Sequence, residues 1–195
     1  RNAALKIAKG EYIGFSDHDD EFVQGFLAHA YREAKDKNAD LVKVAKREYI
    51  YKGDKLVRTK QSCLPQRVYY REDIRKEYFN LVDADEMDCL WDALIKKQII
   101  CDNNLWLNEN LKHGGEDIEF IQRLIPLLDC FVTIDTIYYK HYIRRGFSTS
   151  TKWNPDEQDA KMIIMTEMVN TMKLLNIDIK EYEFDYTYQL LRQYI

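Results

Sequence analysis

The sequence contains few of the residues that interrupt or cross-link a polypeptide chain. Its 195 residues include three prolines, seven glycines and four cysteines. The cysteines are irregularly spaced and form no CxxC pair, so the sequence predicts neither a zinc site nor a disulfide framework. We therefore expect reduced thiols, as is usual in a cytosolic protein. The sequence also has no internal repeat and no low-complexity segment.

Two further absences limit the range of functions. No apolar run approaches the roughly 20 residues that span a bilayer, and the first ten residues lack the apolar core of a signal peptide. The net charge of −4 gives no excess of basic residues for binding a nucleic acid. We expect a cytoplasmic protein without a transmembrane segment, and peripheral association with the inner face of a membrane stays open.

Apolar residues recur with both helical and strand periods along the chain. Helical spacing predicts helices over the following ranges: 1–10, 21–37, 70–80, 86–100, 116–128, 156–174 and 181–195. Alternating or β-branched runs predict a strand at 12–15, a hairpin over 40–60 with its turn at Gly53, and a strand at 131–142. Strands that alternate with helices predict an α/β fold, with a mixed sheet flanked by helices.

The stretch EYIGFSDHDDEF, residues 11–22, places four carboxylates directly after a short apolar strand. The acids are Asp17, Asp19, Asp20 and Glu21. Such neighbours repel one another unless water screens them, a proton is shared or a cation lies between them. Because ligands commonly bind where the strands of an α/β sheet end, and oxygen ligands select Mg²⁺ or Mn²⁺, the stretch is a candidate metal site. The alternative is that these acids stabilise the N-terminus of the next helix.

Two known acidic motifs can be compared with these letters. An EF-hand loop would require glycine and glutamate where the sequence has Phe22 and Ala28, so that motif is excluded. The DxDx(T/V) pattern of aspartyl-nucleophile phosphatases fits Asp17 and Asp19, but Glu21 occupies its final position. In that alternative, Asp17 would attack a phosphate ester.

Four blocks of sequence resemble family 2 glycosyltransferases, in their order and approximate spacing. They are RNAALKIAKGEYIGFSDHDD, CLWDALIKKQII, GGEDIEFIQRL and IYYKHYIRRGFSTS. The resemblance covers about residues 1–150 and implies a GT-A fold, a nucleotide-diphosphate sugar donor, and Mn²⁺ or Mg²⁺ as the cofactor. It also implies two regions, a transferase domain over 1–150 and a helical extension over 151–195.

The resemblance does not extend to the first part of the family's domain. The family's first strand precedes the arginine-asparagine helix, and it has no counterpart before Arg1. Residues 1–10 also have the pattern of the body and end of a helix. We therefore expect the chain to belong to a longer protein, and residues 1–195 alone to be inactive.

The resemblance assigns the donor side of the site to five residues. Asp17 and Asp19 would hold the donor and its metal ion. His141 is a third candidate metal ligand, and the alternative is a strand histidine packed at the end of the sheet. Arg144 and Arg145 would contact the donor phosphates, because arginine makes bidentate contacts with phosphate oxygens. The alternative for the two arginines is that they are solvated charges in a loop.

The acceptor side and the catalytic base come from the same resemblance. It implies inverting transfer to a hydroxyl of a glycan or glycolipid. Asp117 would be the base, and Glu116 would orient the acceptor or the base. Both acids also suit the start of a helix after two glycines. Trp91 would stack on an acceptor sugar or belong to the core, and His113 would lie in an acceptor-side loop. A transferase-like module that binds glycans or protein partners without catalysis is a further alternative.

Overall fold

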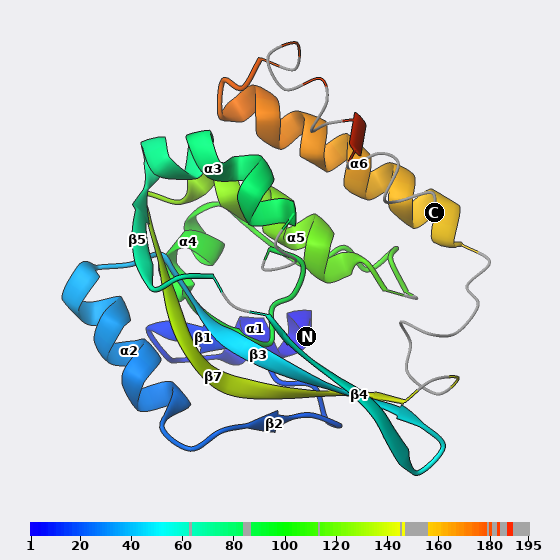
Figure 1. Cartoon of the computed structure of the whole chain (residues 1–195). Helices are drawn as coiled ribbons and strands as arrows, with labels where there is room; N and C mark the ends of the chain where they lie inside the picture. Colours follow the sequence, from blue (N-terminus) through cyan, green and yellow to red (C-terminus); the bar gives the residue numbers. More distant parts are fainter. Residues whose placement is uncertain are drawn as a thin grey trace.

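A mixed sheet with helices on both faces forms the protein (Figure 1). The computed structural model describes residues 1–62, 64–83, 87–112, 114–144, 146, 156–178, 180, 183, 187 and 188. One face of the sheet packs against the second helix of the chain, and the other packs against the remaining helices. This arrangement confirms the predicted α/β fold with a mixed sheet.

Seven strands make up the sheet. They are β1 (Tyr12–Gly14), β2 (Glu21–Phe22), β3 (Leu41–Lys52), β4 (Lys55–Ser62), β5 (Arg67–Tyr70), β6 (Ala93–Lys96) and β7 (Cys130–Arg144). The order is β1-β6-β3-β7-β2, with β4 paired to β3 and β5 paired to β7. The central pair β3 and β7 is parallel, whereas the other pairs in the described part of the chain are antiparallel.

The helices fall mostly where the apolar spacing predicts them. They are α1 (Asn2–Ile7), α2 (Phe26–Lys37), α3 (Arg71–Asp83), α4 (Lys97–Asp102), α5 (Glu116–Leu124) and α6 (Glu157–Leu174), with a 3₁₀ turn over Ile125–Leu127. Most of the predicted helix at 181–195 lies outside the described residues. In the part of the chain that the structure describes, no helix combines the length and the apolar character needed to cross a bilayer.

The predicted helix over 21–37 begins five residues too early. Glu21 and Phe22 pair with β7 as the short strand β2, and the helix starts only after Gly25, which has a φ of 92°. Glycine adopts this left-handed conformation without the steric cost that other residues meet. The acids after Phe15 are therefore separated from α2 and do not stabilise its N-terminus.

The predicted helix over 86–100 is wrong in its central part, where the chain forms β6. Leu94 packs under α2, whereas Ala93 and Ile95 belong to the core on the opposite face of the sheet. A strand that is buried on both faces has a continuous apolar run, and such a run cannot be distinguished from a buried helix by periodicity alone. Only residues 97–102 of this segment are helical, as α4.

Two apolar cores lie on opposite faces of the sheet. The smaller core lies under α2 and includes Phe26, Val44 and Ile134. The larger core joins the sheet to the other helices, and Met172 of α6 belongs to it. The last long helix therefore packs into the same core as α5 and supports it from outside.

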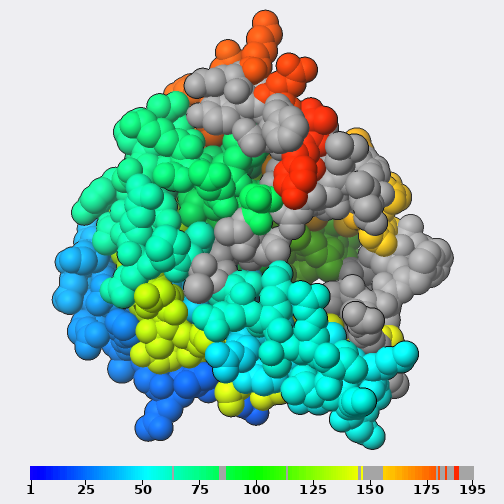
Figure 2. Space-filling view, viewed as in Figure 1, coloured from blue at the N-terminus to red at the C-terminus, as the bar shows by residue number. Residues whose placement is uncertain are grey.

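The hairpin of β3 and β4 projects beyond the rest of the sheet (Figure 1). Its turn contains Gly53, which has a φ of 58°, as the predicted hairpin requires. In the space-filling view its side chains form the cyan block at the lower right of the surface (Figure 2). The register changes between Ile50 and Tyr51, and this irregularity lies where the hairpin leaves the body of the sheet.

A cluster of buried charges lies beside the first half of β3. The Lys43 ammonium lies 2.7 Å from the Asp92 carboxylate and donates to the Cys89 carbonyl, and both charged side chains are fully buried. Lys46 lies 3.7 Å from Asp92 and 3.2 Å from the more exposed Asp88. Burial alone would lower the pKa of Lys43, but the Asp92 carboxylate raises it above the usual value. The lysine therefore stays charged inside the protein.

Replacing Asp92 with alanine should be strongly destabilising. The change leaves the Lys43 charge buried without its counter-ion, so we expect the free energy of unfolding to fall by about 3–5 kcal/mol. Urea unfolding monitored by circular dichroism would measure it. The matched control is Asp88→Ala, where a partly exposed ion pair should contribute less than about 1 kcal/mol. Equal losses in the two variants would contradict the proposed importance of the buried pair.

Candidate active site

The acidic stretch forms a loop that is fixed to β7. The carboxylate of Asp20 accepts a hydrogen bond of 2.9 Å from the Tyr139 hydroxyl and one of 2.8 Å from the Tyr142 amide. Burial raises the pKa of Asp20, and the hydrogen bond from Tyr142 opposes this shift. Asp20 therefore anchors the loop, while Asp17 and Asp19 remain for other contacts.

The second acidic pair lies at the start of α5. Gly115 precedes this helix with a φ of 88°, and a Cβ atom there would come within 3.0 Å of Ile164 on α6. Conformation and space therefore both favour glycine at this position. Glu116 and Asp117 follow in the first turn, where the unpaired amide groups of the helix favour negative charge.

The guanidinium of Arg1 joins the two acidic segments. Its Nη2 atom lies 2.6 Å from Asp17, and its Nη1 atom lies 2.7 Å from Glu116 and 2.8 Å from Asp117. The contacts with Glu116 and Asp117 connect residues that are more than 110 positions apart in the sequence. Two of the predicted catalytic residues and one predicted donor ligand therefore meet at a single cation, which we call the Arg1 centre.

The surroundings of Asp117 increase its affinity for a proton. Burial, together with the neighbouring Glu116 carboxylate, raises the pKa of Asp117 to about 7, although Arg1 opposes the shift. Two carboxylates this close favour retention of a proton on one of them. Asp117 can therefore both bind and release a proton near neutral pH, which a general acid or base must do.

Asp19 lies in a more open part of the loop than Asp17. Its side chain is 39% exposed, and its carboxylate is 3.6 Å from the Arg144 guanidinium and 4.0 Å from His18. Arg144 ends β7. The structure thus brings together two of the residues predicted to bind the donor, while Arg145 lies outside the described residues.

The three predicted metal ligands do not form one cluster. Asp17 is bonded to Arg1, and the His141 Nδ1 atom lies 3.8 Å from Glu48. Among the residues that the structure describes, no group of three acidic, histidine or cysteine side chains could hold a metal ion. Mg²⁺ commonly binds one or two carboxylates together with substrate phosphates. The residues present therefore fit a metal ion at Asp19, provided that the substrate supplies most of its ligands.

The predicted acceptor residue Trp91 is packed inside the protein. It is 7% exposed, its ring stacks on Tyr139 at 4.3 Å between centroids, and the Lys46 ammonium lies 5.0 Å from its centre. His141 packs against the same ring at 4.9 Å. This geometry supports the alternative in which Trp91 is a core residue. His113 lies outside the described residues.

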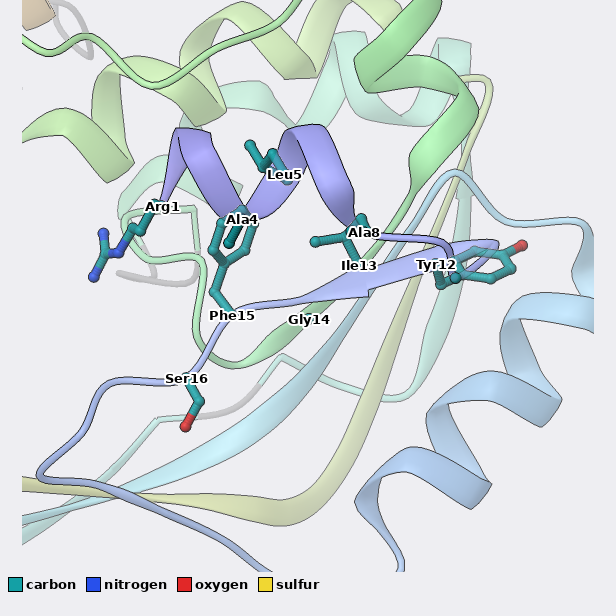
Figure 3. Close-up of a pocket in the computed structure, with 10 residues that line it drawn as sticks. Arg1, Ala4, Leu5, Ala8, Tyr12, Ile13, Gly14, Phe15 and Ser16 are labelled. Atoms are coloured by element: carbon teal, nitrogen blue, oxygen red, sulfur yellow. The ribbon is translucent and has the colours of Figure 1, made fainter.

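A pocket of about 500 Å³ lies between α1 and β1. Ala4 and Leu5 of α1 line it together with Ala8 and Ile13, so much of its wall is apolar (Figure 3). Arg1 lies toward the Ser16 end of the pocket, away from Tyr12 (Figure 3). The pocket therefore runs from the edge of the sheet to the Arg1 centre.

Reasoning from the sequence missed the contacts made by Arg1, Tyr139 and Tyr142. The arginine is part of the arginine-asparagine block that carries the family resemblance, so a signal for its importance was present. Its partners were not predictable, because they depend on how α1 is placed against α5. The two tyrosines belong to the tyrosine-rich block of the same resemblance, but nothing in the sequence indicated that they hold Asp20.

Comparisons with known proteins show which sequences and folds this chain is similar to. Residues 1–91 match the model of the family described as Glycosyl transferase family 2. The cholesterol galactosyltransferase of Borreliella burgdorferi is 28% identical over 159 residues, which cover 77% of this chain and 43% of that protein.

Solved structures of the S. aureus protein TarS share the fold. TarS 1–349 in complex with UDP-GlcNAc has a TM-score of 0.64 at 17% identity, covering 89% of this chain and 49% of that chain. TarS 1–349 without a named ligand has a TM-score of 0.59 at 17% identity. This match covers 90% of the present chain and 48% of that chain. The present chain thus spans less than half the length of these relatives.

The fold and the position of the acidic loop define a domain of the GT-A class. Within that class, residues 1–91 match glycosyl transferase family 2, and the curated relative supports the same family. The resemblance seen in the four sequence blocks is thereby confirmed. The comparisons give no support to the phosphatase alternative.

The raised pKa of Asp117 predicts a specific dependence of stability on pH. A carboxyl group with a higher pKa in the folded than in the unfolded state stabilises the fold at low pH, and this contribution is lost as the pH rises from about 4 to about 7. Asp117→Asn should remove this loss. We expect its stability relative to the native protein to increase by about 2 kcal/mol between pH 5 and pH 8.

Urea unfolding at a series of pH values would measure this difference. The exposed Asp36 on α2 provides the matched control, because Asp36→Asn makes the same chemical change at an exposed position outside the Arg1 centre. A difference between Asp117→Asn and the native protein that does not change with pH would contradict the assigned environment of Asp117.

Proposed function

We propose that the protein transfers a sugar from a nucleotide-diphosphate donor to a hydroxyl group of a glycan or glycolipid, with inversion at the anomeric carbon. The observation that carries this proposal is the Arg1 centre, which places the donor-side Asp17 and the candidate base Asp117 on one guanidinium. The match to glycosyl transferase family 2 supports the reaction class.

Two relatives support the choice of substrates. TarS forms a complex with UDP-GlcNAc, which supports a nucleotide-diphosphate sugar as the donor. The Borreliella burgdorferi relative is named a cholesterol galactosyltransferase, and this name supports a lipid hydroxyl as the acceptor over a soluble glycan. The sugar itself follows from neither comparison.

The proposed reaction needs a base, and Asp117 meets the requirements. The acceptor hydroxyl must lose a proton as its oxygen attacks the anomeric carbon, and a carboxylate within hydrogen-bond reach can accept that proton. A pKa of about 7 keeps a large part of Asp117 unprotonated at neutral pH while making it a stronger base than an ordinary aspartate. Glu116 and Arg1 hold the carboxylate in place.

The leaving diphosphate carries negative charge that must be balanced. Arg144 lies beside Asp19 at the open edge of the loop, where its guanidinium can bind phosphate oxygens. A divalent cation at Asp19 would supply further positive charge for the departing diphosphate. Asp20 fixes the loop that presents both groups, through its bonds to β7.

Substituting the proposed base should abolish transfer but leave donor binding intact. For Asp117→Asn in the complete protein we expect kcat to fall at least about 100-fold, in the range for loss of a general base. UDP release from UDP-galactose and UDP-GlcNAc, with cholesterol in detergent as the acceptor, would be measured. The Kd for UDP should change less than threefold. Asp36→Asn is the control and should keep the native kcat. An Asp117→Asn variant that retains more than a tenth of the native activity would refute the assignment of Asp117 as the base.

The same base predicts a pH profile. Because protonation of Asp117 inactivates it, kcat/KM should fall about tenfold per pH unit below about pH 7. The rate would be followed between pH 5 and pH 9 under the same assay. A flat profile across this range would show that another group removes the proton.

A metal ion at Asp19 predicts coupled binding of cation and nucleotide. We expect UDP to bind at least about tenfold more tightly with Mn²⁺ than with EDTA, and Asp19→Asn to remove most of this difference. Calorimetry would give the affinities, and the electron paramagnetic resonance of Mn²⁺ would report the metal directly. Asp36→Asn again serves as the control. Equal UDP affinity with and without the cation in the native protein would exclude the metal role.

A further inference from the structure

The projecting hairpin differs in charge from the rest of the chain. Between residues 47 and 60 it carries five basic residues and two acidic ones, whereas the whole chain has a net charge of −4. The basic residues are Arg47, Lys52, Lys55, Arg58 and Lys60. The side chains of residues 52–59 are all exposed. A local surface of positive charge therefore stands on a protein that is negative overall.

Two aliphatic side chains lie within this basic segment. Leu56 is 43% exposed and Val57 is 47% exposed, and they lie between Lys55 and Arg58 in the sequence. Exposed aliphatic residues are unremarkable when they are scattered singly, but here two adjacent ones are flanked by cations. A surface with these properties matches the interface of a lipid bilayer, where cations meet anionic headgroups and aliphatic groups enter the acyl region.

The hairpin is also connected to the candidate active site. Glu48 of β3 lies opposite His141 of β7, and Tyr51 lies opposite Arg144. The Arg144 guanidinium in turn lies 3.6 Å from Asp19. The strand β3, which carries the tip of the hairpin, is thus paired with β7, which ends beside the acidic loop, so a surface that binds the tip lies near this loop.

We propose that the tip of the hairpin, residues 52–58, docks on an anionic lipid bilayer. The aliphatic pair favours a bilayer over a soluble polyanion, because a polyanion would use the positive charges and leave Leu56 and Val57 in water. Long basic side chains can remain at the headgroups while apolar neighbours insert. This inference goes beyond the proposed sugar transfer, because binding to lipid requires neither donor nor acceptor.

Sedimentation with lipid vesicles tests the proposal directly. The purified protein would be mixed with vesicles of phosphatidylcholine alone, or of phosphatidylcholine with phosphatidylglycerol as the anionic lipid. We expect binding to the anionic vesicles and little binding to the neutral ones. Raising the salt from about 0.05 M to about 0.5 M should weaken the binding at least tenfold, because salt screens charges on exposed surfaces.

Removing two positive charges from the tip should weaken this binding. For Lys55→Gln combined with Arg58→Gln we expect a loss of roughly 30-fold, since each basic residue near an anionic surface contributes about fivefold. The control is Lys76→Gln combined with Lys173→Gln, which changes the net charge equally on exposed positions of α3 and α6. That control should bind within about twofold of the native protein.

Removing the aliphatic pair separates a bilayer from a polyanion. Leu56→Ser combined with Val57→Ser should weaken vesicle binding at least about fivefold, because less apolar surface enters the membrane. Leu27→Ser combined with Leu174→Ser removes two exposed leucines elsewhere and should have no effect. Thermal unfolding of each variant would establish that it is folded.

Three results would overturn the proposal. The first is no binding of the native protein to anionic vesicles at low salt. The second is an equal loss of binding in the tip variants and their controls. The third is loss of binding in the charge variant with none in the variant that lacks the aliphatic pair, together with equally tight binding to soluble polyphosphate, which would identify a polyanion as the ligand.

Discussion

One arginine among three carboxylates is the constraint on which the candidate site depends. Arg1 contributes a single positive charge to Asp17, Glu116 and Asp117, so full ionisation of all three acids would leave two uncompensated negative charges. The imbalance is greatest at Asp117, which is the most buried of the three side chains. Its raised pKa follows from this arrangement. The contacts that hold the acidic loop against α5 therefore also give one of the acids a proton affinity suited to catalysis.

A second set of contacts holds the loop from the sheet. Asp20 is bonded to Tyr139, whose ring stacks on Trp91, and Trp91 packs under the Lys46 ammonium. Lys46 belongs to the buried charge cluster around Asp92. The loop is thus connected, through stacked rings, to a part of the core where displacement of charge is costly. Asp20 provides this anchor, whereas the more exposed Asp19 contacts Arg144 at the open edge of the loop.

The sequence predicted the features that depend on neighbouring residues. The strand before the acids, the hairpin turn at Gly53 and the acids at the start of α5 all follow from short patterns, and the family resemblance singled out the acids that meet at Arg1. Two kinds of feature could not be predicted. Leu94 and Ile95 face different cores because β6 lies between two other strands, which is a property of the whole sheet. The bonds of Arg1 to Glu116 and Asp117 join positions more than 110 residues apart and depend on tertiary packing.

The parallel pair of β3 and β7 links the hairpin to the candidate site. Both strands run from the buried centre of the sheet toward the projecting tip, and their pairing continues as far as Tyr51 and Arg144. Strands paired over this length move as one unit, so a surface that fixes the tip also fixes the orientation of the acidic loop. A lipid acceptor presents its hydroxyl at the level of the headgroups. Because β7, which ends beside the acidic loop, is paired with the β3 strand of the hairpin, a docked tip brings this loop to the level of such a hydroxyl while the lipid stays in the bilayer.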